Sequence, residues 1–243
     1  MEQVQFSMPR IGDPAPAFEA RSTEGKINFP EDFKGKWVIL FSHPADFTPV
    51  CTSEFVVIAS QLKDFEELNC KLIGLSVDGL FSHIAWLRTI KEKIHYKGIT
   101  ETDFSFPLIE DVTMSVAQKY GMMQPGESDT KTVRAVFIID PNNKIRTIIY
   151  YPLSVGRNID EIKRVLIALQ ATDALGIGTP ANWQPGDDMI MAPAESCEIA
   201  EVNMESVDKD SSAKCFDWFF VTKSISKEFV MKTIKEWHKI AYK

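Results

Sequence analysis

The sequence predicts an α/β protein in which helices flank a mixed sheet, followed by a smaller C-terminal extension. Short apolar segments rich in β-branched or aromatic residues alternate with segments in which apolar residues recur every three or four positions. Beyond residue 170, glycine and proline interrupt this regularity. We therefore expect one domain over residues 1–170 and a second region over residues 171–243, for which a chain of 243 residues has room.

Four segments are predicted to be strands, because each is short, apolar and bounded by turn-forming residues. They are Trp37–Ser42, Lys71–Val77, Ala135–Ile139 and Ile145–Tyr151. The first three are almost continuously apolar, which is typical of strands covered on both faces. The turn-forming cluster between the last two predicts an antiparallel hairpin.

An amphipathic helix is predicted between the first two strands, because apolar residues recur there at spacings of three and four. These residues are Phe55, Ile58, Ala59, Leu62, Phe65 and Leu68. Further helices are predicted over Phe81–Glu92, Val112–Lys119, Ile159–Gln170 and Ser226–Tyr242. Strand, helix and strand form a βαβ unit, and the sheet accounts for residues from about 10 to 170.

Composition and charge exclude several classes of function. A net charge of −7 argues against binding to nucleic acid, which needs a concentrated basic face. The longest apolar run, Trp37–Phe41, is far shorter than the roughly 20 residues of a membrane-spanning helix. The first ten residues lack a basic start followed by an apolar stretch, so we expect no secretory signal. We therefore expect a cytoplasmic protein that binds neither nucleic acid nor membrane.

The cysteine and histidine spacings predict no metal site and no dithiol pair. The four cysteines at positions 51, 70, 197 and 215 contain no C-x-x-C spacing, and the four histidines contain no His-x-x-x-His pair. In a reducing compartment we expect these cysteines to be thiols at rest. We accordingly expect no metal and no other cofactor.

The candidate chemistry lies in Thr48-Pro49-Val50-Cys51, where a threonine stands where a redox dithiol motif would carry its first cysteine. Cys51 follows the first strand and begins a helix, and free amides and the helix dipole at this position favour a thiolate. The Thr48 hydroxyl can orient an incoming oxygen compound, but it cannot form a disulfide. The site therefore suits attack on the O–O bond of a peroxide, which leaves a sulfenic acid on Cys51.

Neighbouring residues have candidate roles that leave alternatives open. Arg134, just before the third strand, is the candidate cation for stabilising the leaving oxygen, although a lone arginine also forms surface ion pairs. Pro44 and Phe47 are expected to crowd the loop and keep bulk water from the sulfur. His43, at the end of the first strand, is either a satisfied core histidine or a catalytic group. An isolated cysteine such as Cys51 can also be a small buried apolar residue.

These residues together resemble a known family. Pro44-x-x-x-Thr48-x-x-Cys51, followed by Glu54, resembles the active-site motif of the peroxiredoxins. The wider FSHPADFTPVCTSE is similar to their one-cysteine, peroxiredoxin-6-like branch, close to archaeal and bacterial thioredoxin peroxidases. The stretches at 151–170 and 179–188 support that branch. The resemblance implies a thioredoxin-like peroxidase domain over 1–170 and a dimerisation extension over 171–243.

The resemblance also implies an activity. Peroxiredoxins reduce hydrogen peroxide and organic hydroperoxides to water and alcohols in antioxidant defence, without a prosthetic group. A thiol such as thioredoxin is the reductant, and the subunits form homodimers or larger rings such as decamers. Carried over by motif, Cys51 is the peroxidatic cysteine, Thr48 and Arg134 hold the peroxide, and Pro44 shields the pocket. Glu54 and Arg157 support the arginine network.

Two departures from the family pattern limit what can be carried over. Residues 33–37 contain no serine where animal members have a G-x-S-x-G stretch, so phospholipase activity is not implied. Archaeal members place a resolving cysteine where this chain has Val221. Cys215 therefore either resolves the sulfenic acid of another subunit or merely packs among the aromatic residues of the tail. Cys197 is a weaker candidate for the resolving cysteine, and Cys70 is expected to lie in the core.

Two rival functions remain. A chaperone-like holdase would use an oligomer and the aromatic residues of the tail, which are Phe216, Trp218, Phe219 and Phe220. Dithiol–disulfide exchange is disfavoured because Thr48 replaces the first cysteine of the pair.

Overall fold

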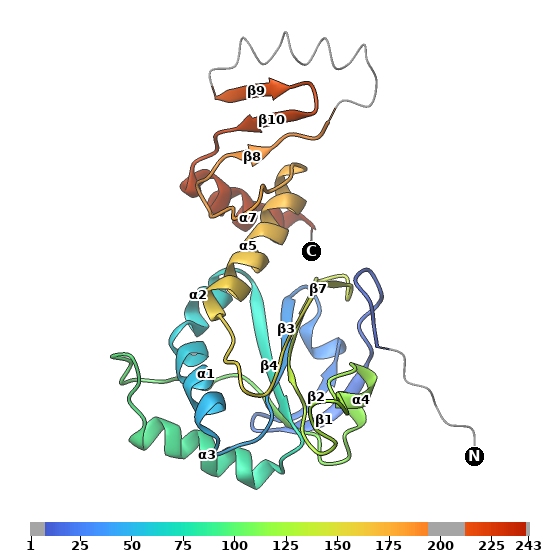
Figure 1. The fold of residues 1–243 in the computed structure, drawn as a ribbon, viewed down its shortest axis with the longest axis vertical. Coiled ribbons are helices and arrows are strands. Elements are labelled where there is room, and N and C mark those ends of the chain that lie inside the picture. The colour runs from blue at the N-terminus through green and yellow to red at the C-terminus, as the bar shows by residue number, and fades with distance from the viewer. Residues whose placement is uncertain (1–7, 194–211, 242–243) are drawn as a thin grey trace, which may run out of the picture. The chain divides into compact units, whose positions relative to one another are not determined.

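A computed structural model describes residues 8–193 and 212–241 of the chain. The chain divides into two compact units, Met1–Ile159 and Asp160–Lys243. The first unit contains a seven-stranded mixed sheet in the order β2-β1-β5-β4-β3-β6-β7 (Figure 1). Its strands are β1 (Phe18–Ser22), β2 (Gly25–Phe29), β3 (Trp37–Ser42), β4 (Cys70–Ser76), β5 (Leu108–Glu110), β6 (Arg134–Ile139) and β7 (Ile145–Tyr151).

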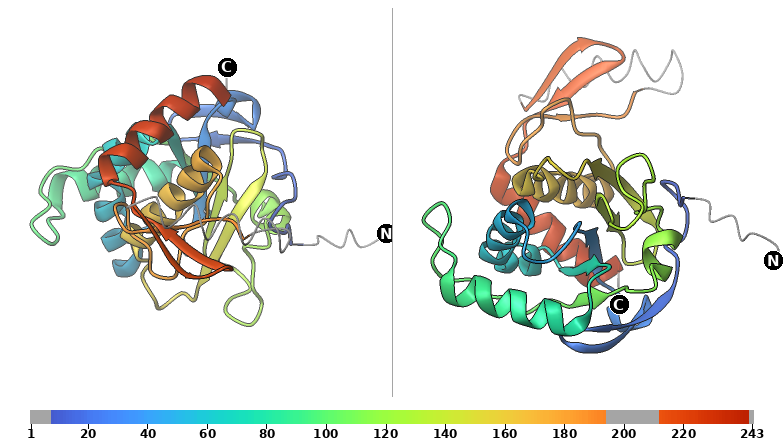
Figure 2. Two further views of the ribbon diagram at one scale, coloured as in Figure 1. Left: turned by 90° about the horizontal axis from the view of Figure 1, so that it is seen from above. Right: turned by 60° about the horizontal axis from the view of Figure 1, so that its bottom comes forward.

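Helices cover both faces of this sheet. They are η1 (Glu31–Phe33), α1 (Pro49–Ser60), α2 (Leu62–Glu67), α3 (Leu80–Lys93) and α4 (Ser115–Lys119). The β3–β4 and β4–β5 pairs are parallel, and because β5, β4 and β3 are consecutive in the sheet, both crossovers run in the same direction across it. Because such crossovers are right-handed, α1, α2 and α3 lie on one face, while α4 lies on the other (Figures 1 and 2).

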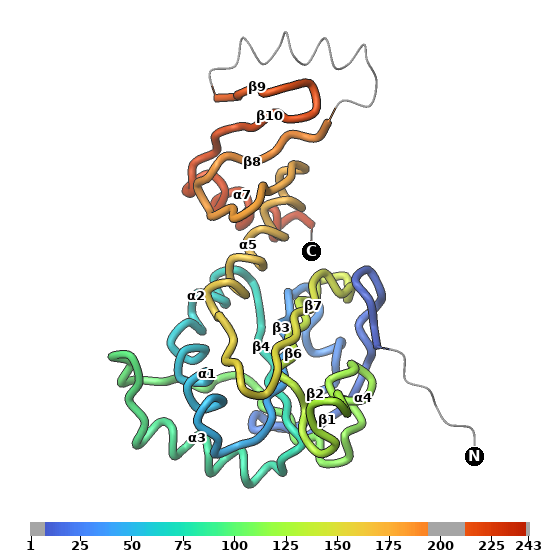
Figure 3. The backbone as a smooth tube through the Cα atoms, viewed as in Figure 1, coloured from blue at the N-terminus to red at the C-terminus, as the bar shows by residue number. Residues whose placement is uncertain are grey.

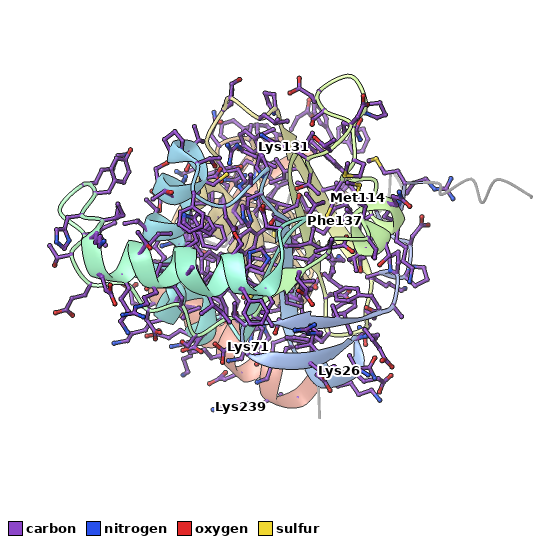
Figure 4. All side chains as sticks on the ribbon, turned by 90° about the horizontal axis from the view of Figure 1, so that it is seen from below. Lys26, Lys71, Met114, Lys131, Phe137 and Lys239 are labelled. Carbon is purple, nitrogen blue, oxygen red and sulfur yellow. The ribbon has the colours of Figure 1, made fainter. Side chains whose placement is uncertain are left out.

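The apolar core has a layer on each face of the sheet. The face covered by α4 packs Leu40, Phe137 and Tyr120 together with the ends of β1 and β2. The opposite face packs Phe41 against Phe55, which in turn contacts Trp86 at a ring distance of 4.6 Å. Figure 4 shows Phe137 near the middle of the view and the charged Lys26 toward its edge. The alternation of side chains along β3 therefore supplies both layers.

The predicted fold class is confirmed, and two helix predictions are corrected. The helix expected from Phe55 to Leu68 is interrupted at Gln61, whose backbone leaves the helical conformation (φ −105°, ψ 6°). The helix expected over Val112–Lys119 begins only at Ser115. Met114 is left-handed (φ 58°), and the carboxylate of Asp111 accepts the N–H groups of Val116 and Ala117 at 3.2 and 2.7 Å. An acidic N-terminal anchor thus replaces the expected first turn.

Three strands of the first unit were missed by the sequence reading. β1 and β2 alternate apolar and polar residues over only five positions each, and Gly25 closes their hairpin with a positive φ. β5 has only three residues and pairs with β4. Such short segments carry too little periodicity to be separated from loops.

The second unit contains α5 (Ile159–Leu175, whose first residue belongs to the first unit), β8 (Met189–Ile190), β9 (Ala213–Asp217), β10 (Phe220–Lys223) and α7 (Lys227–Ala241). Figure 3 shows β8, β10 and β9 side by side as a three-stranded antiparallel sheet. These strands were not expected from the sequence, whereas helices at the positions of α5 and α7 were. The predicted boundary near residue 170 falls within α5 and stays a prediction. The acidic stretch at 195–210, with Cys197, lies outside the described residues.

Among residues 8–193 and 212–241, every helix is too short or too polar to cross a lipid bilayer.

The packing around Phe137 predicts a large loss of stability on truncation. Phe137 is fully buried and contacts Tyr120 and Tyr150 edge-on, so Phe137→Ala leaves a cavity between the sheet and α4. We expect the free energy of unfolding to fall by about 3–5 kcal/mol in urea titration. Ile11→Ala, at a side chain that is 66% exposed, is the control and should change it by less than about 0.5 kcal/mol. Equal effects of the two changes would contradict this packing.

Candidate active site

Cys51 lies in the first turn of α1. Thr48 is the N-cap residue with extended backbone angles, and Pro49 occupies the first helical position, where a missing N–H costs nothing. The Cys51 side chain is fully buried. The sulfur therefore lies close to the unpaired amides of the helix start, where a negative charge is favoured.

The guanidinium of Arg134 contacts this sulfur directly. Arg134 is the first residue of β6, and its Nη1 donates to Sγ of Cys51 at 3.2 Å. Its Nε and Nη2 donate to the carbonyl oxygen of Leu153 at 3.0 and 2.7 Å, which fixes the plane of the group. Arg134 is 2% exposed, so the alternative of a surface ion pair does not hold for this residue.

Glu54 lies one helical turn after Cys51 and joins two arginines. It accepts from Nη1 of Arg134 at 2.8 Å and from Nη2 of Arg157 at 2.7 Å, and it also accepts the backbone N–H of Arg157 at 2.7 Å. Burial by itself opposes ionisation, but Arg157 and then Arg134 outweigh it and hold the pKa of Glu54 below its ordinary value. Arg157 also donates to the carbonyl oxygens of Ser42 and Ala135.

The charges of this cluster do not cancel. Two buried guanidinium groups surround one carboxylate, so one positive charge is in excess. A buried charge without a counter-charge is costly. A thiolate on Cys51 restores neutrality at the atom that Arg134 already contacts. The arrangement can therefore hold a nucleophilic sulfur and, beside it, cationic donors for a leaving oxygen.

The loop before α1 contains the other residues expected at the site. Pro44 is buried, and the hydroxyl of Thr48 donates to the carbonyl oxygen of Ala45 at 2.8 Å. Phe47 is 58% exposed, and its backbone is left-handed with a φ of 55°. Its expected role in keeping bulk water from the sulfur stays a prediction.

His43 lies in a buried hydrogen-bonded chain that the sequence reading did not find. Its Nε2 lies 3.0 Å from Oδ1 of Asp46, whose Oδ2 lies 2.8 Å from Nδ1 of His83. Asp46 and His83 are 37 residues apart, so no spacing rule joins them. The available signal was a polar His83 on the helix face that also carries Trp86 and Ile90.

The other described cysteines differ from Cys51. Cys70 is buried in β4, as expected, and burial raises the pKa of its thiol well above the ordinary value, so it is inert. Cys215, in β9, is partly exposed and lies opposite Val221 of β10. Among the described residues, Cys51, Cys70 and Cys215 are free thiols.

One group of side chains has the spacing of a metal site. Potential ligand atoms of His43, Asp46 and Asp78 lie within 4.8 Å of one another. Their oxygens already accept hydrogen bonds, however, including those from Ser76 Oγ and the Asp46 N–H to Oδ2 of Asp78. This pattern favours a hydrogen-bond network over a cation. The expectation of no metal stays a prediction.

A cavity of about 460 Å³ adjoins the loop and the first turns of α1. Its lining is mostly apolar and includes Phe47, Thr48, Trp86, Ile90 and Tyr96. The cavity therefore reaches the Thr48 end of the site but not the sulfur itself.

Two family models match the chain. Residues 11–148 match the AhpC/TSA family, and residues 168–203 match the C-terminal domain of 1-Cys peroxiredoxin. The first match alone covers more than half of the chain.

Curated relatives match over nearly their full lengths. A peroxiredoxin of Methanosarcina mazei is 57% identical over 216 residues, which cover 89% of this chain and 98% of that protein. A peroxiredoxin of Aquifex aeolicus is 48% identical over 229 residues, covering 90% of this chain and 98% of that protein.

Solved structures of the same kind are similar in fold. A yeast mitochondrial 1-Cys peroxiredoxin, studied for thiol resolution through the glutathione and thioredoxin systems, is 42% identical with a TM-score of 0.76 over 90% of this chain and 100% of that chain. A cysteine-to-serine mutant of the peroxiredoxin 6 of Arenicola marina is 35% identical with a TM-score of 0.77 over 89% and 99%. These comparisons give no support to the holdase alternative.

The charge cluster predicts a specific response to acid. Glu54→Gln leaves two buried guanidinium groups without their carboxylate, so we expect the free energy of unfolding near neutral pH to fall by about 3–5 kcal/mol. Because the pKa of Glu54 is lower in the folded protein than in the unfolded chain, its stabilisation is complete above the ordinary value of 4.5 and is lost as the pH falls through the lowered value.

Urea titrations between neutral and acidic pH check this prediction. The stability of Glu54→Gln should fall less steeply below the ordinary carboxylate pKa than that of the parent. Glu24→Gln, at an exposed carboxylate outside the cluster, is the control and should keep the parent's pH dependence. A parent-like acid slope in Glu54→Gln would show that Glu54 is not the titrating group.

Proposed function

This chain belongs to the peroxiredoxin family and is a thiol-dependent peroxidase, and we propose that Cys51 is the thiol that attacks the hydroperoxide. The observation that supports this assignment most directly is the 3.2 Å contact between Nη1 of Arg134 and Sγ of Cys51. Of the three described cysteines, Cys51 alone lies at a helix start with a guanidinium on its sulfur.

The reaction follows from this arrangement. The Cys51 thiolate attacks the terminal oxygen of the hydroperoxide, so an S–O bond forms and the O–O bond breaks. The leaving oxygen takes a proton and departs as water or alcohol, and Cys51 is left as a sulfenic acid. One thiol then condenses with the sulfenic acid to a mixed disulfide and releases water, and a second thiol restores Cys51 and departs as a disulfide.

The neighbouring residues receive roles in this reaction. We assign Arg134 and Thr48 to holding the peroxide, since Arg134 can donate to the leaving oxygen and Thr48 stands at the helix entrance. The buried Pro44 shields the site from water. Glu54 and Arg157 support Arg134 through the paired contacts described above.

The apolar cavity beside Thr48 has a role when the substrate is an organic hydroperoxide. Its lining by Phe47, Trp86 and Tyr96 suits an alkyl group, while the peroxide end lies toward Thr48. Hydrogen peroxide makes no use of this cavity.

We propose that Cys215 is the resolving cysteine. It is paired across the β9–β10 hairpin with Val221, the position at which archaeal members carry a further cysteine. Side chains directly opposite in an antiparallel pair lie on the same face with Cβ atoms about 4.5–5.5 Å apart. A thiol at position 215 can therefore reach nearly the same place as a thiol at position 221.

The assembly and reductant are proposals of the same kind. Phe216, Trp218 and Phe219 are 65, 49 and 56% exposed, which favours a covering partner subunit in a homodimer or a larger ring such as a decamer. Thioredoxin is the proposed reductant, because the yeast relative was studied with the glutathione and thioredoxin systems. Free thiols at Cys51, Cys70 and Cys215 favour a reducing compartment, such as the cytoplasm.

Peroxide consumption tests the assignment of Cys51 and Arg134. Cys51→Ser should abolish the reduction of hydrogen peroxide in the presence of thiol. Arg134→Gln should lower the second-order rate constant by about 100- to 1,000-fold, because it removes a charged donor from the leaving oxygen. Cys70→Ser, at a buried and inert thiol, is the control and should retain the parent rate. Peroxide consumption by Cys51→Ser at the parent rate would refute the assignment.

Mass analysis without reductant tests the role of Cys215. After one equivalent of hydrogen peroxide, the parent should give a covalent dimer joined by Cys51 and Cys215, and Cys215→Ser should give a monomer carrying a sulfenic acid. A monomeric sulfenic acid in the parent would show that outside thiols resolve Cys51 instead.

A further inference from the structure

Three buried side chains, those of His43, Asp46 and His83, form a hydrogen-bonded chain at the loop that leads to Cys51. Asp46, within this loop, bridges His43 at the end of β3 and His83 in the first turns of α3. The side chains of both histidines are 0% exposed, and that of Asp46 is 1% exposed. None of the three takes part in the reaction at the sulfur proposed above, yet together they place three ionisable groups in the core.

Both ring nitrogens of His83 make hydrogen bonds. Its Nε2 lies 3.0 Å from the carbonyl oxygen of Ile109, which can only accept, so Nε2 carries a hydrogen. Its Nδ1 lies 2.8 Å from Oδ2 of Asp46. Burial by itself favours the neutral carboxyl, but the hydrogen bonds to the two histidines outweigh it and hold the pKa of Asp46 well below its ordinary value. Both ring nitrogens of His83 are therefore held by oxygen atoms, one of the main chain and one of Asp46.

The same reasoning fixes the tautomer of His43. Its Nε2 faces Oδ1 of the ionised Asp46 and therefore donates, whereas its Nδ1 has no hydrogen-bond partner in the described part of the chain. Burial, only partly opposed by Asp46, holds the pKa of His43 below its ordinary value, and the charges of His83 and Arg157 act in the same direction. His43 is therefore neutral, with a bare nitrogen at Nδ1.

Asp46 also fixes the backbone of the loop. Its N–H donates to Oδ2 of Asp78 at 2.9 Å, so both its side chain and its main chain are anchored. The next residue, Phe47, has a φ of 55°, a conformation that a bulky residue adopts only under constraint. Thr48, the N-cap of α1, follows immediately. The anchors on Asp46 thus set the position from which the helix carrying Cys51 begins.

We propose that Asp46 and His83 are positioning residues of the peroxidase, whose buried hydrogen bond holds His43 as the Nε2–H tautomer and fixes the loop that places Thr48 and Cys51. The proposal rests on the function assigned to Cys51 above. The proposal adds Asp46 and His83 to the site. His83 lies on α3 and reaches the site through its hydrogen bond with Asp46.

Nitrogen NMR of the reduced protein tests the hydrogen-bonded network independently of catalysis. The imidazole 15N shifts distinguish the imidazolium from each neutral tautomer, and single His→Gln changes at the four histidines assign the signals. Near neutral pH we expect a neutral Nε2–H ring at His43. Asp46→Asn should change the signals of both His43 and His83, because an amide offers one accepting oxygen where the carboxylate offers two. An Nδ1–H tautomer of His43 in the parent, or unchanged signals in Asp46→Asn, would overturn the proposal.

Kinetics test the positioning role. Asp46→Asn and His83→Gln should each lower the rate constant for hydrogen peroxide by about 10- to 100-fold, because the reacting groups are misplaced. Leu87→Ala, on α3 and buried but outside the network, is the stability-matched control and should keep the parent rate. Parent rates in both network variants would overturn the positioning role. Full activity in Cys51→Ser would instead refute the assigned function and leave the NMR result standing.

Discussion

The contact between the Arg134 guanidinium and the Cys51 sulfur depends on a buried cluster of charged side chains. Without a negative charge on that sulfur, the cluster has one positive charge in excess. Glu54 holds two arginines in the core, and the second of them, Arg157, is anchored further by two main-chain carbonyl groups. The excess positive charge lies at Arg134. Besides Glu54, its guanidinium donates to the carbonyl oxygen of Leu153 and to the sulfur of Cys51. Neutrality of the cluster and reactivity of the thiol are therefore the same physical requirement.

The fold brings these groups together from separate parts of the chain. β3 and β6 are antiparallel neighbours, so the end of β3, which leads into the loop before α1, lies beside the start of β6, where Arg134 stands. The register of α1 then places Cys51 and Glu54 three residues apart on one face of the helix. The loop after β7 supplies Leu153 and Arg157. A change of one residue in the β6 register would turn Arg134 to the other face of the sheet.

Sequence reasoning located the parts of the site that are local or belong to a motif. Cys51 at a helix start and Thr48 before it follow from residues that lie close together in the chain. Asp46 and His83 were missed, because their contact spans 37 residues and neither belongs to a recognisable spacing. The left-handed backbone of Phe47 was also missed, because a positive φ at an aromatic residue depends on the anchors around it. For the fold, long apolar strands were found, whereas the three-residue β5 and the hairpin of the second unit carry too little pattern.

Direct observation of the ionised sulfur in the resting protein tests this account most closely. The ultraviolet absorbance of thiolates can be compared near neutral pH in the reduced parent, in Cys51→Ser and in Arg134→Gln. We predict that the parent shows one thiolate more than Cys51→Ser and that Arg134→Gln loses the same signal. Equal absorbance in the parent and Cys51→Ser would contradict the claim that the buried arginine holds a charged sulfur at position 51.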